Sequence, residues 1–289
     1  MPTQTPAQWR AHINAHRARL APDVEAHRAR KSRHQKHPVW DFLWEYYSFR
    51  PNSLLQWSPG LGVELLEAAP EFAGKEWTPT LQGVALDPAK FPLHRLDAAR
   101  QTLHLLEQTA ARPAFHACFG LHEWAMVYRG QTRHSSPLRL SEHQIADLVE
   151  SQGVRCSHFD AFRFFAPDAR PLNLLQPGPD NRADFEQPGC IHASMDLYKH
   201  AYKFYPWIAS ELIADAFELT RDARLVDMRA APYDLNDFGV VPIPIETPEG
   251  RREYAAAQRE IAARAAPLRA RLAEAYRALI TAVERSQRG

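Results

Sequence analysis

The chain has 289 residues, of which 45% are hydrophobic and 24% charged, so it can bury a core in one large or two small domains. Its formal net charge of +1 excludes a global field that draws the whole protein onto nucleic acid or an anionic membrane. No run of about 18 apolar residues occurs, so neither a transmembrane helix nor a membrane partner is expected. Three cysteines, Cys118, Cys156 and Cys190, form no CxxC pair, and their odd number argues against a disulfide framework. This pattern predicts a reduced, cytoplasmic setting.

The N-terminal segment is strongly basic. Apolar residues at helical spacing predict a helix over residues 6–36, with Pro22 as a candidate break. The first 38 residues carry a net charge of +6, and their basic residues are Arg10, Arg17, Arg19, Arg28, Arg30, Lys31, Arg33 and Lys36. We therefore expect a flexible, basic, helical arm over residues 1–36. Residues 10–36 of this arm would provide an electrostatic footprint for nucleic acid.

Further helices are predicted from apolar periodicity and capping residues, over 37–51, 92–112, 136–153, 190–224 and 248–286. Ser141 and Thr247 are the expected N-caps of two of them. Pro206 is expected to bend the fourth and Pro267 to interrupt the last.

The remaining segments are predicted to be shorter elements or loops. Residues 57–72 read as a turn followed by a short helix, and 113–130 as either a buried helix or a buried strand. Strict alternation over 154–165 predicts a strand. Loops are expected over 73–91 and 166–189, which are rich in proline and glycine. The prediction is an α+β, predominantly α-helical protein with a few short strands, in which residues 37–289 form a single catalytic domain.

The stretch "RCSHFDAFRFF" contains the first candidate site. On a strand, His158 and Asp160 would point to the same face, among phenylalanines. Burying a charge without a partner costs free energy, so we expect these two residues to have a structural or functional role. Either His158 orients Asp160 as a base or a metal ligand, or the two form a structural hydrogen bond.

The stretch "CIHASMDLYKHAYKFYPW" contains the second candidate site. On a helix, His192, Asp196 and His200 would form one polar stripe with Lys199 beside it. The apolar residues around them indicate a buried helix, on which charges are usually paired and often functional. A plain surface ion pair is the alternative.

Shorter signals lie elsewhere in the chain. In "FGLHEWAMVY" we favour Glu123 over its neighbour His122 as a functional side chain. The Gly-x-Gly turn in "WSPGLGVELL" could present backbone N–H groups to a phosphate at a helix start. In "YYSFRP", Tyr47 and Arg50 combine an aromatic face with a guanidinium, which suits a base and a phosphate, although core packing explains the aromatics equally well.

Taken together, the segments "HPVWDFLWEYYSFRP", "FGLHEWAMVY", "RCSHFDAFRFF", "QPGCIHASMDLYKHAYK" and "IETPEGRREYAAAQ" resemble a bacterial family commonly labelled 3-methyladenine DNA glycosylase. The resemblance extends from about His37 to Ala282. The catalytic Asp that helix-hairpin-helix glycosylases carry beyond their hairpin has no clear counterpart, and Asp87 is the nearest Asp.

The resemblance implies a hydrolase that acts on a nucleobase or a related heteroaromatic, as in DNA base excision. Its catalytic network would consist of Asp160, His158, Glu123, His192, Asp196 and Lys199. Its substrate would contact Tyr47, Arg50, Trp124, Arg163 and Tyr198. No cofactor is expected for this reaction.

Two alternatives remain open. One is a metal-dependent enzyme that acts on a small molecule, with Fe(II) or Zn held by His158, Asp160 and His192 in the two-His-one-carboxylate pattern. The other is a non-enzymatic binding protein in which the histidines form structural pairs.

Overall fold

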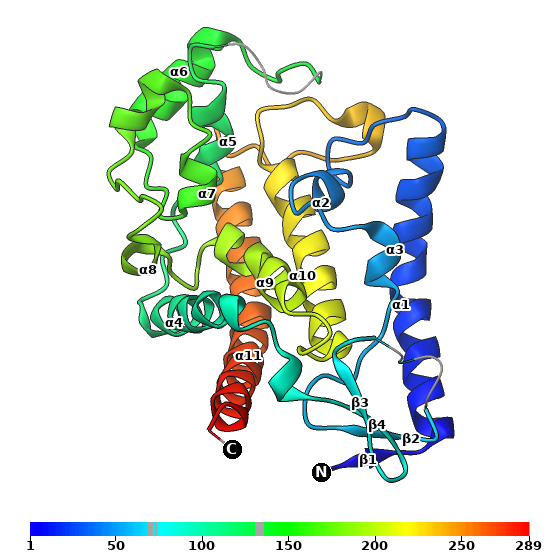
Figure 1. Cartoon of the computed structure of the whole chain (residues 1–289). Helices are drawn as coiled ribbons and strands as arrows, with labels where there is room; N and C mark the ends of the chain where they lie inside the picture. Colours follow the sequence, from blue (N-terminus) through cyan, green and yellow to red (C-terminus); the bar gives the residue numbers. More distant parts are fainter. Residues whose placement is uncertain (69–71, 73, 131–135, 289) are drawn as a thin grey trace.

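The computed structural model describes residues 1–68, 72, 74–130 and 136–288. Three long helices run along the molecule: α1 (Pro6–Ser32), α10 (Ser210–Arg229) and α11 (Pro248–Ser286) (Figure 1). Helices α4 (Leu96–Ala111) and α9 (Ile191–Lys203) pack against this frame. The prediction of a predominantly helical α+β protein is confirmed. No helix within these described ranges is long and apolar enough to cross a membrane.

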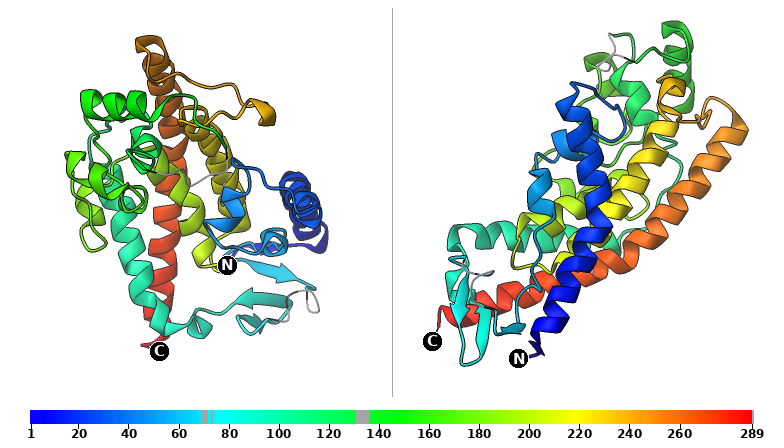
Figure 2. Two further views of the ribbon diagram at one scale, coloured as in Figure 1. Left: turned by 90° about the horizontal axis from the view of Figure 1, so that it is seen from above. Right: turned by 90° about the vertical axis from the view of Figure 1, so that its right-hand side faces the viewer.

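A small sheet lies at one end of the molecule, next to both termini (Figures 1 and 2). Its strand order is β1 (Thr3–Gln4), β2 (Glu64–Leu66), β4 (Gly83–Leu86) and β3 (Trp77–Pro79), and only the β1–β2 pair is parallel. The short helix predicted within 57–72 and the loop predicted over 73–91 were therefore wrong. A Cβ on Gly83 would lie 1.8 Å from the Leu65 carbonyl oxygen, so glycine permits the close β2–β4 pairing.

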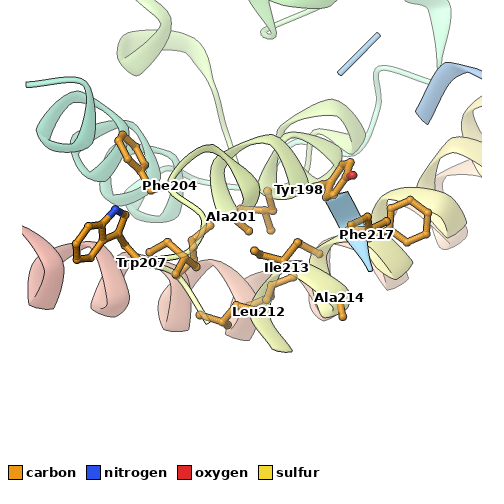
Figure 3. Close-up of a cluster of buried hydrophobic side chains, with 14 of the residues drawn as sticks. Tyr198, Ala201, Phe204, Trp207, Leu212, Ile213, Ala214 and Phe217 are labelled. Carbon is orange, nitrogen blue, oxygen red and sulfur yellow. The ribbon is translucent and has the colours of Figure 1, made fainter. Parts of the chain in front are cut away.

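Helices α9 and α10 bury the main apolar core between them. Figure 3 shows this cluster, in which Phe217 and Ala214 are fully buried. Tyr198 packs edge-on against Phe217, with ring centroids 5.3 Å apart. The chain turns between the two helices around Pro206, close to the predicted bend.

Helix α1 is an integral part of the fold rather than a flexible arm. It continues through Pro22, and Trp9, Leu20 and Val24 are at most 1% exposed. Arg19 also binds α10 through Glu218 Oε2, at 2.7 Å. Because its apolar face belongs to the core, the expectation of a flexible arm was wrong.

The helix caps follow the sequence closely. Ser141 forms a capping box with Gln144 at the start of α6 (Glu142–Gln152), and Thr247 caps α11. Helix α11 ends at Ser286 as predicted. It also continues through Pro267, where an interruption had been expected.

Short elements gather at the end of the molecule opposite the sheet (Figure 1). They are connected by loops, and α2 and α5 contact α10 through Arg224. These are α2 (Phe42–Glu45), α5 (Leu121–Met126), α7 (Phe159–Phe162) and η4 (Asn236–Phe238). The other short helices are α3 (Pro51–Leu54), η1 (Pro88–Lys90), η2 (Leu93–Arg95), η3 (Pro167–Leu172) and α8 (Arg182–Phe185).

The strand predicted over 154–165 is not present. Only Val154 forms a bridge, to Asn173, whose side chain bonds the backbone N–H and C=O of Cys156. The side-chain amide of Asn173 thus provides the two hydrogen bonds that a neighbouring strand would otherwise provide. The chain then enters α7, where the His158 ring accepts a hydrogen bond from the backbone N–H of Ala161.

Candidate active site

A pocket of about 610 Å³ opens between α2, α5, α7, α9 and α10. Its aromatic lining consists of His37, Phe42, Tyr46, Phe164, His192 and Phe238. Its charged lining consists of Lys36, Asp41, Glu45, Glu123, Asp160 and Arg224. The volume and this mixture of apolar walls with a few polar groups are typical of small-molecule sites.

The wall formed by α2 is held in a fixed position. Asp41 accepts hydrogen bonds from the Arg30 side chain at 2.9 Å and from the His37 backbone N–H at 2.8 Å. Phe42 stacks on Tyr46 with centroids 4.7 Å apart, and the Arg224 guanidinium lies 4.1 Å from the Phe42 ring centroid. Burial, followed by the carboxylate of Asp196, raises the pKa of Tyr46 to about 12, so its hydroxyl stays protonated.

The first polar group of the pocket comprises His122, Glu123, His192, Arg224 and Asp227, and we call it the histidine–carboxylate group. Arg224 Nη1 contacts Asp227 Oδ2 at 2.8 Å and Glu123 Oε1 at 3.3 Å. His122 Nε2 lies 3.0 Å from Asp227 Oδ1, and His192 Nε2 lies 3.8 Å from Asp227 Oδ2. The ring centroids of the two histidines are 4.3 Å apart.

The pKa values of the two histidines of this group are shifted in opposite directions. Burial would lower the pKa of His122, but the nearby Asp227 and Glu123 carboxylates outweigh it, so the pKa is raised. The pKa of His192 is well below its usual value because of burial and the neighbouring His122. His192 is therefore neutral. Burial would raise the pKa of Asp227, but His122 and Arg224 outweigh it, so the pKa is lowered and Asp227 stays ionised.

The second polar group comprises His158, Asp160, Arg182, Glu186, Asp196 and Lys199, and we call it the ion-pair network. Its contacts connect α7, α8 and α9. His158 Nε2 lies 3.2 Å from Asp196 Oδ2, while Lys199 binds both Asp196 and, at 3.1 Å, Asp160. Arg182 Nη2 contacts Asp160, Asp196 and Glu186 at 3.2, 3.4 and 3.0 Å.

The ion-pair network keeps its carboxylates charged. Burial would raise the pKa of Asp196, but Lys199 and His158 hold it well below the usual range. Burial likewise opposes the ionised form of Asp160, and Lys199 and Arg182 outweigh it, so this pKa is also lowered. A carboxylate with a lowered pKa is a weak base, which makes Asp160 an electrostatic group rather than a proton acceptor.

The structure thus brings together all six predicted catalytic residues, but not in the predicted arrangement. His158 bonds Asp196, and it does not orient Asp160 across a strand face. Burial, followed by the Lys199 charge, lowers the pKa of His200 to about 3, so its ring is neutral. The proposed metal triad is also divided, because His192 groups with His122 and Asp227, whereas Asp160 groups with His158 and Asp196.

The predicted substrate-binding residues mostly lie outside the pocket. Tyr47 and Tyr198 pack edge-on in the core behind its wall, 5.3 Å apart. Trp124 is fully buried and donates its indole N–H to the Ala230 carbonyl at 2.8 Å. A ligand in the pocket would touch none of the three, because each aromatic face is covered by the core. Arg50 lines a neighbouring depression.

Arg163 keeps a connection to the site through Asp160, which it contacts at 3.3 Å. Its side chain is 46% exposed, so it can rotate toward solvent or toward a ligand. The lysine and arginine residues near Asp160 therefore differ: Lys199 and Arg182 are fixed by several partners, whereas Arg163 is not.

Sequence reasoning missed Arg224 and Asp227, which hold the histidine–carboxylate group together. At a spacing of three residues on a helix they resemble a surface ion pair. Their neighbours Ala223 and Met228 are buried, and this charged pair within an apolar stretch of α10 was the available signal.

The three cysteines form no CxxC pair in the sequence, but all of them line one small cavity of about 20 Å³, together with His122 and His192. A cavity of that size holds about one water molecule. Burial raises the pKa of Cys156 to about 12, so the thiol is not a nucleophile at neutral pH.

Chemically, the pocket offers apolar and aromatic walls, an ionised carboxylate at Asp160 and a second carboxylate at Glu123 with one unbonded oxygen. No protein-family model, curated protein or solved structure matches the chain. The resemblance to the bacterial family labelled 3-methyladenine DNA glycosylase therefore stays a prediction.

Proposed function

We propose that the protein is a hydrolase that cleaves the N-glycosidic bond of a nucleobase or a related heteroaromatic, with alkylated DNA as the substrate class. The observation that carries the proposal is the aromatic slot with two carboxylates, Glu123 and Asp160, on its lining. The choice of DNA rests on the sequence resemblance.

The size of the slot suits a single ring system. The stacked pair Phe42 and Tyr46 presents a flat wall, with Phe164 and Phe238 also lining the space. About 610 Å³ admits a nucleoside but not a duplex, so a base would have to leave the helix stack first.

The two carboxylates suit different parts of the reaction. Glu123 lines the pocket, and its buried Oε2 has no hydrogen-bond partner among the described residues, so this oxygen would accept a proton from a water molecule that enters the site. Asp160 stays ionised and would stabilise the positive charge that develops on the sugar. Water then forms a bond to the anomeric carbon, the carbon–nitrogen bond breaks, and the proton of water passes to Glu123. A purine alkylated on ring nitrogen N3 or N7 is cationic in the nucleoside, so it leaves as a neutral molecule without being protonated.

Basic residues at the C-terminal end of α1 suit a phosphate backbone. Lys36 lines the pocket itself, and Lys31 lines the depression next to it. Arg33 is exposed at the same end of the helix. These charges would hold the strand while one base enters the slot.

The test is release of free base from a methylated oligonucleotide, measured by chromatography. Glu123→Gln should lower the rate about 100-fold or more, and Asp160→Asn should lower it as well. Asp147→Asn, on the exposed face of α6, is the matched control and should keep the wild-type rate. Wild-type protein that releases no base from methylated DNA or from methylated nucleosides would rule out the proposal.

A further inference from the structure

We propose that His122, His192 and Asp227 bind a divalent transition-metal ion, zinc or iron(II), beside the pocket. This site differs from the triad His158, Asp160 and His192 suggested by the sequence. It goes beyond the proposed function, because metal binding needs no substrate and can be measured without one.

The donor atoms already lie close together. One ligand atom from each of the three residues lies within 4.8 Å of the other two. His122 Nε2 and Asp227 Oδ1 are 3.0 Å apart. An ion with bonds of about 2.0–2.2 Å in a tetrahedral arrangement holds neighbouring ligand atoms about 3.3 Å apart. The pair is therefore near the spacing that an ion would impose.

Buried polar atoms in this group have unused bonding capacity. His122 Nε2 and Asp227 Oδ1 lie 3.0 Å apart and have no other partner among the described residues, and Glu123 Oε2 beside them has none at all. The side chains of all three residues are at most 6% exposed. Buried polar atoms nearly always find a partner, and a metal ion would provide one for the imidazole nitrogen and the carboxylate oxygen.

Arg224 acts as the outer partner of these carboxylates. It bonds one oxygen of Asp227, at 2.8 Å, and contacts one oxygen of Glu123, at 3.3 Å, which leaves the other oxygen of each turned away from it. Carboxylates that bind metals are usually held in this way by a second residue. Metal binding requires both histidines to be neutral, and in that state two carboxylates and one guanidinium leave a net charge of −1, which favours a cation.

The ion-pair network offers a second set of close donors, His158, Asp160 and Asp196, but it already contains its cations. Lys199 and Arg182 each contact both Asp160 and Asp196. A metal ion would have to displace two fixed positive charges there. The histidine–carboxylate group contains one arginine, Arg224, which contacts only one oxygen of each carboxylate.

Three protein ligands leave a coordination position open, as in catalytic rather than structural metal sites. His192 and Glu123 both line the large pocket, so that position can face a substrate. A metal-bound water has a much lower pKa than free water. Glu123, which we place outside the ligand set, would then lie next to that water as its proton acceptor.

The experiment uses full-length protein without a histidine tag, stripped with a chelator and then exposed separately to Zn²⁺ and, without oxygen, to Fe²⁺. Elemental analysis after gel filtration should find about one equivalent of one of these metals per chain. His192→Gln and Asp227→Asn should each weaken binding about 100-fold or more in a competition titration with a chromophoric chelator. Circular dichroism checks that each variant is folded.

His158→Gln is the matched control, because it removes a buried histidine of the ion-pair network and should keep one equivalent of metal. Cobalt(II) in place of the native ion adds a spectrum that reports the ligand set and should change in His192→Gln. Folded wild-type protein that binds less than a tenth of an equivalent of either metal would overturn the proposal. So would loss of metal in His158→Gln with retention in His192→Gln, which would place the ion in the network. Neither outcome depends on the glycosidic reaction.

Discussion

Asp196→Asn tests whether the ion-pair network stabilises the fold. Asp196 is 2% exposed and contacts Lys199, His158 and, at 3.4 Å, Arg182. Two unit charges about 4 Å apart attract by about 4 kcal/mol at an effective dielectric constant of about 20. The substitution removes the attraction of Asp196 to two cations. This loss of stability is partly offset, because the repulsion from Asp160 and Glu186 also disappears and one charge fewer has to be desolvated on folding. Breaking a buried ion pair by removing one partner costs about 3–5 kcal/mol, and we expect a loss of that size.

The loss should depend on pH in a defined direction. The pKa of Asp196 is lowered in the folded protein, so its contribution is fully present above the unfolded value of about 3.9 and is lost as the pH falls through the folded value. The free energies of unfolding of wild type and Asp196→Asn should therefore differ by a constant amount between pH 5 and 8. Below about pH 4 the two values should converge.

The assay is urea unfolding followed by circular dichroism at several pH values. Asp147→Asn serves as control, because Asp147 forms only an exposed pair with His143, at 3.4 Å, and should change the free energy by less than about 0.5 kcal/mol. A loss below about 1 kcal/mol for Asp196→Asn at pH 7 would refute the reasoning. It would mean that the desolvation cost of the network cancels its attraction.

Three further predictions concern single contacts, and each is checked by the same unfolding assay. Phe217→Ala should cost about 3–5 kcal/mol, because the ring is fully buried between α9 and α10; a loss below 1 kcal/mol would mean that the core collapses around the cavity. Trp124→Phe should cost about 1–3 kcal/mol, since it leaves the buried Ala230 carbonyl without its donor; an unchanged stability would show that another donor replaces the indole. Ser141→Ala should cost about 1 kcal/mol by removing the cap of α6, and Ser141→Thr should restore most of it.

The start of a helix could be predicted from the sequence where the capping residues are adjacent in the chain. Ser141 and Thr247 each bond a backbone N–H three residues later, so a few adjacent residues determine where the helix begins. The capping hydrogen bond of each helix therefore involves no residue from elsewhere in the chain. The same reasoning failed at Pro22 and Pro267, because tertiary packing holds both helices continuous across the proline.

The false strand at 154–165 has a different cause. Alternation of apolar and polar residues predicts a strand only if a neighbouring strand supplies hydrogen bonds. Here the Asn173 side chain supplies them to Cys156 instead, seventeen residues along the chain. A contact of this kind leaves no periodic signal in the sequence.

The site was only partly predictable for a related reason. The spacing of His192, Asp196 and Lys199 correctly placed all three on one buried helix, α9. It could not show that they face two different groups, because the partners come from α7 and α10. Arg224 and Asp227 are brought to His192 by the packing of α10 against α9, which is a tertiary contact.

Packing of α1 into the core also changes how nucleic-acid binding must be tested. Deletion of residues 1–36 would expose Trp9 and Leu20, which are at most 1% exposed, so the loss of activity would report unfolding. Charge reversal at Lys31 and Arg33 leaves the apolar face of α1 intact. A weaker and less salt-dependent affinity for DNA would then reflect the lost charges alone.

The two polar groups of the pocket differ in how their carboxylates are paired with cations, and this difference suggests that they have different roles. In the ion-pair network each carboxylate contacts cations, so Asp160 is fixed and stays charged. A side chain that stabilises a developing positive charge needs both properties. In the histidine–carboxylate group, Glu123 Oε2 has no partner among the described residues and can take up a proton, whereas Asp227 stays ionised and suits a metal ion. The rings of His158 and His192 stack between the groups, with centroids 5.5 Å apart.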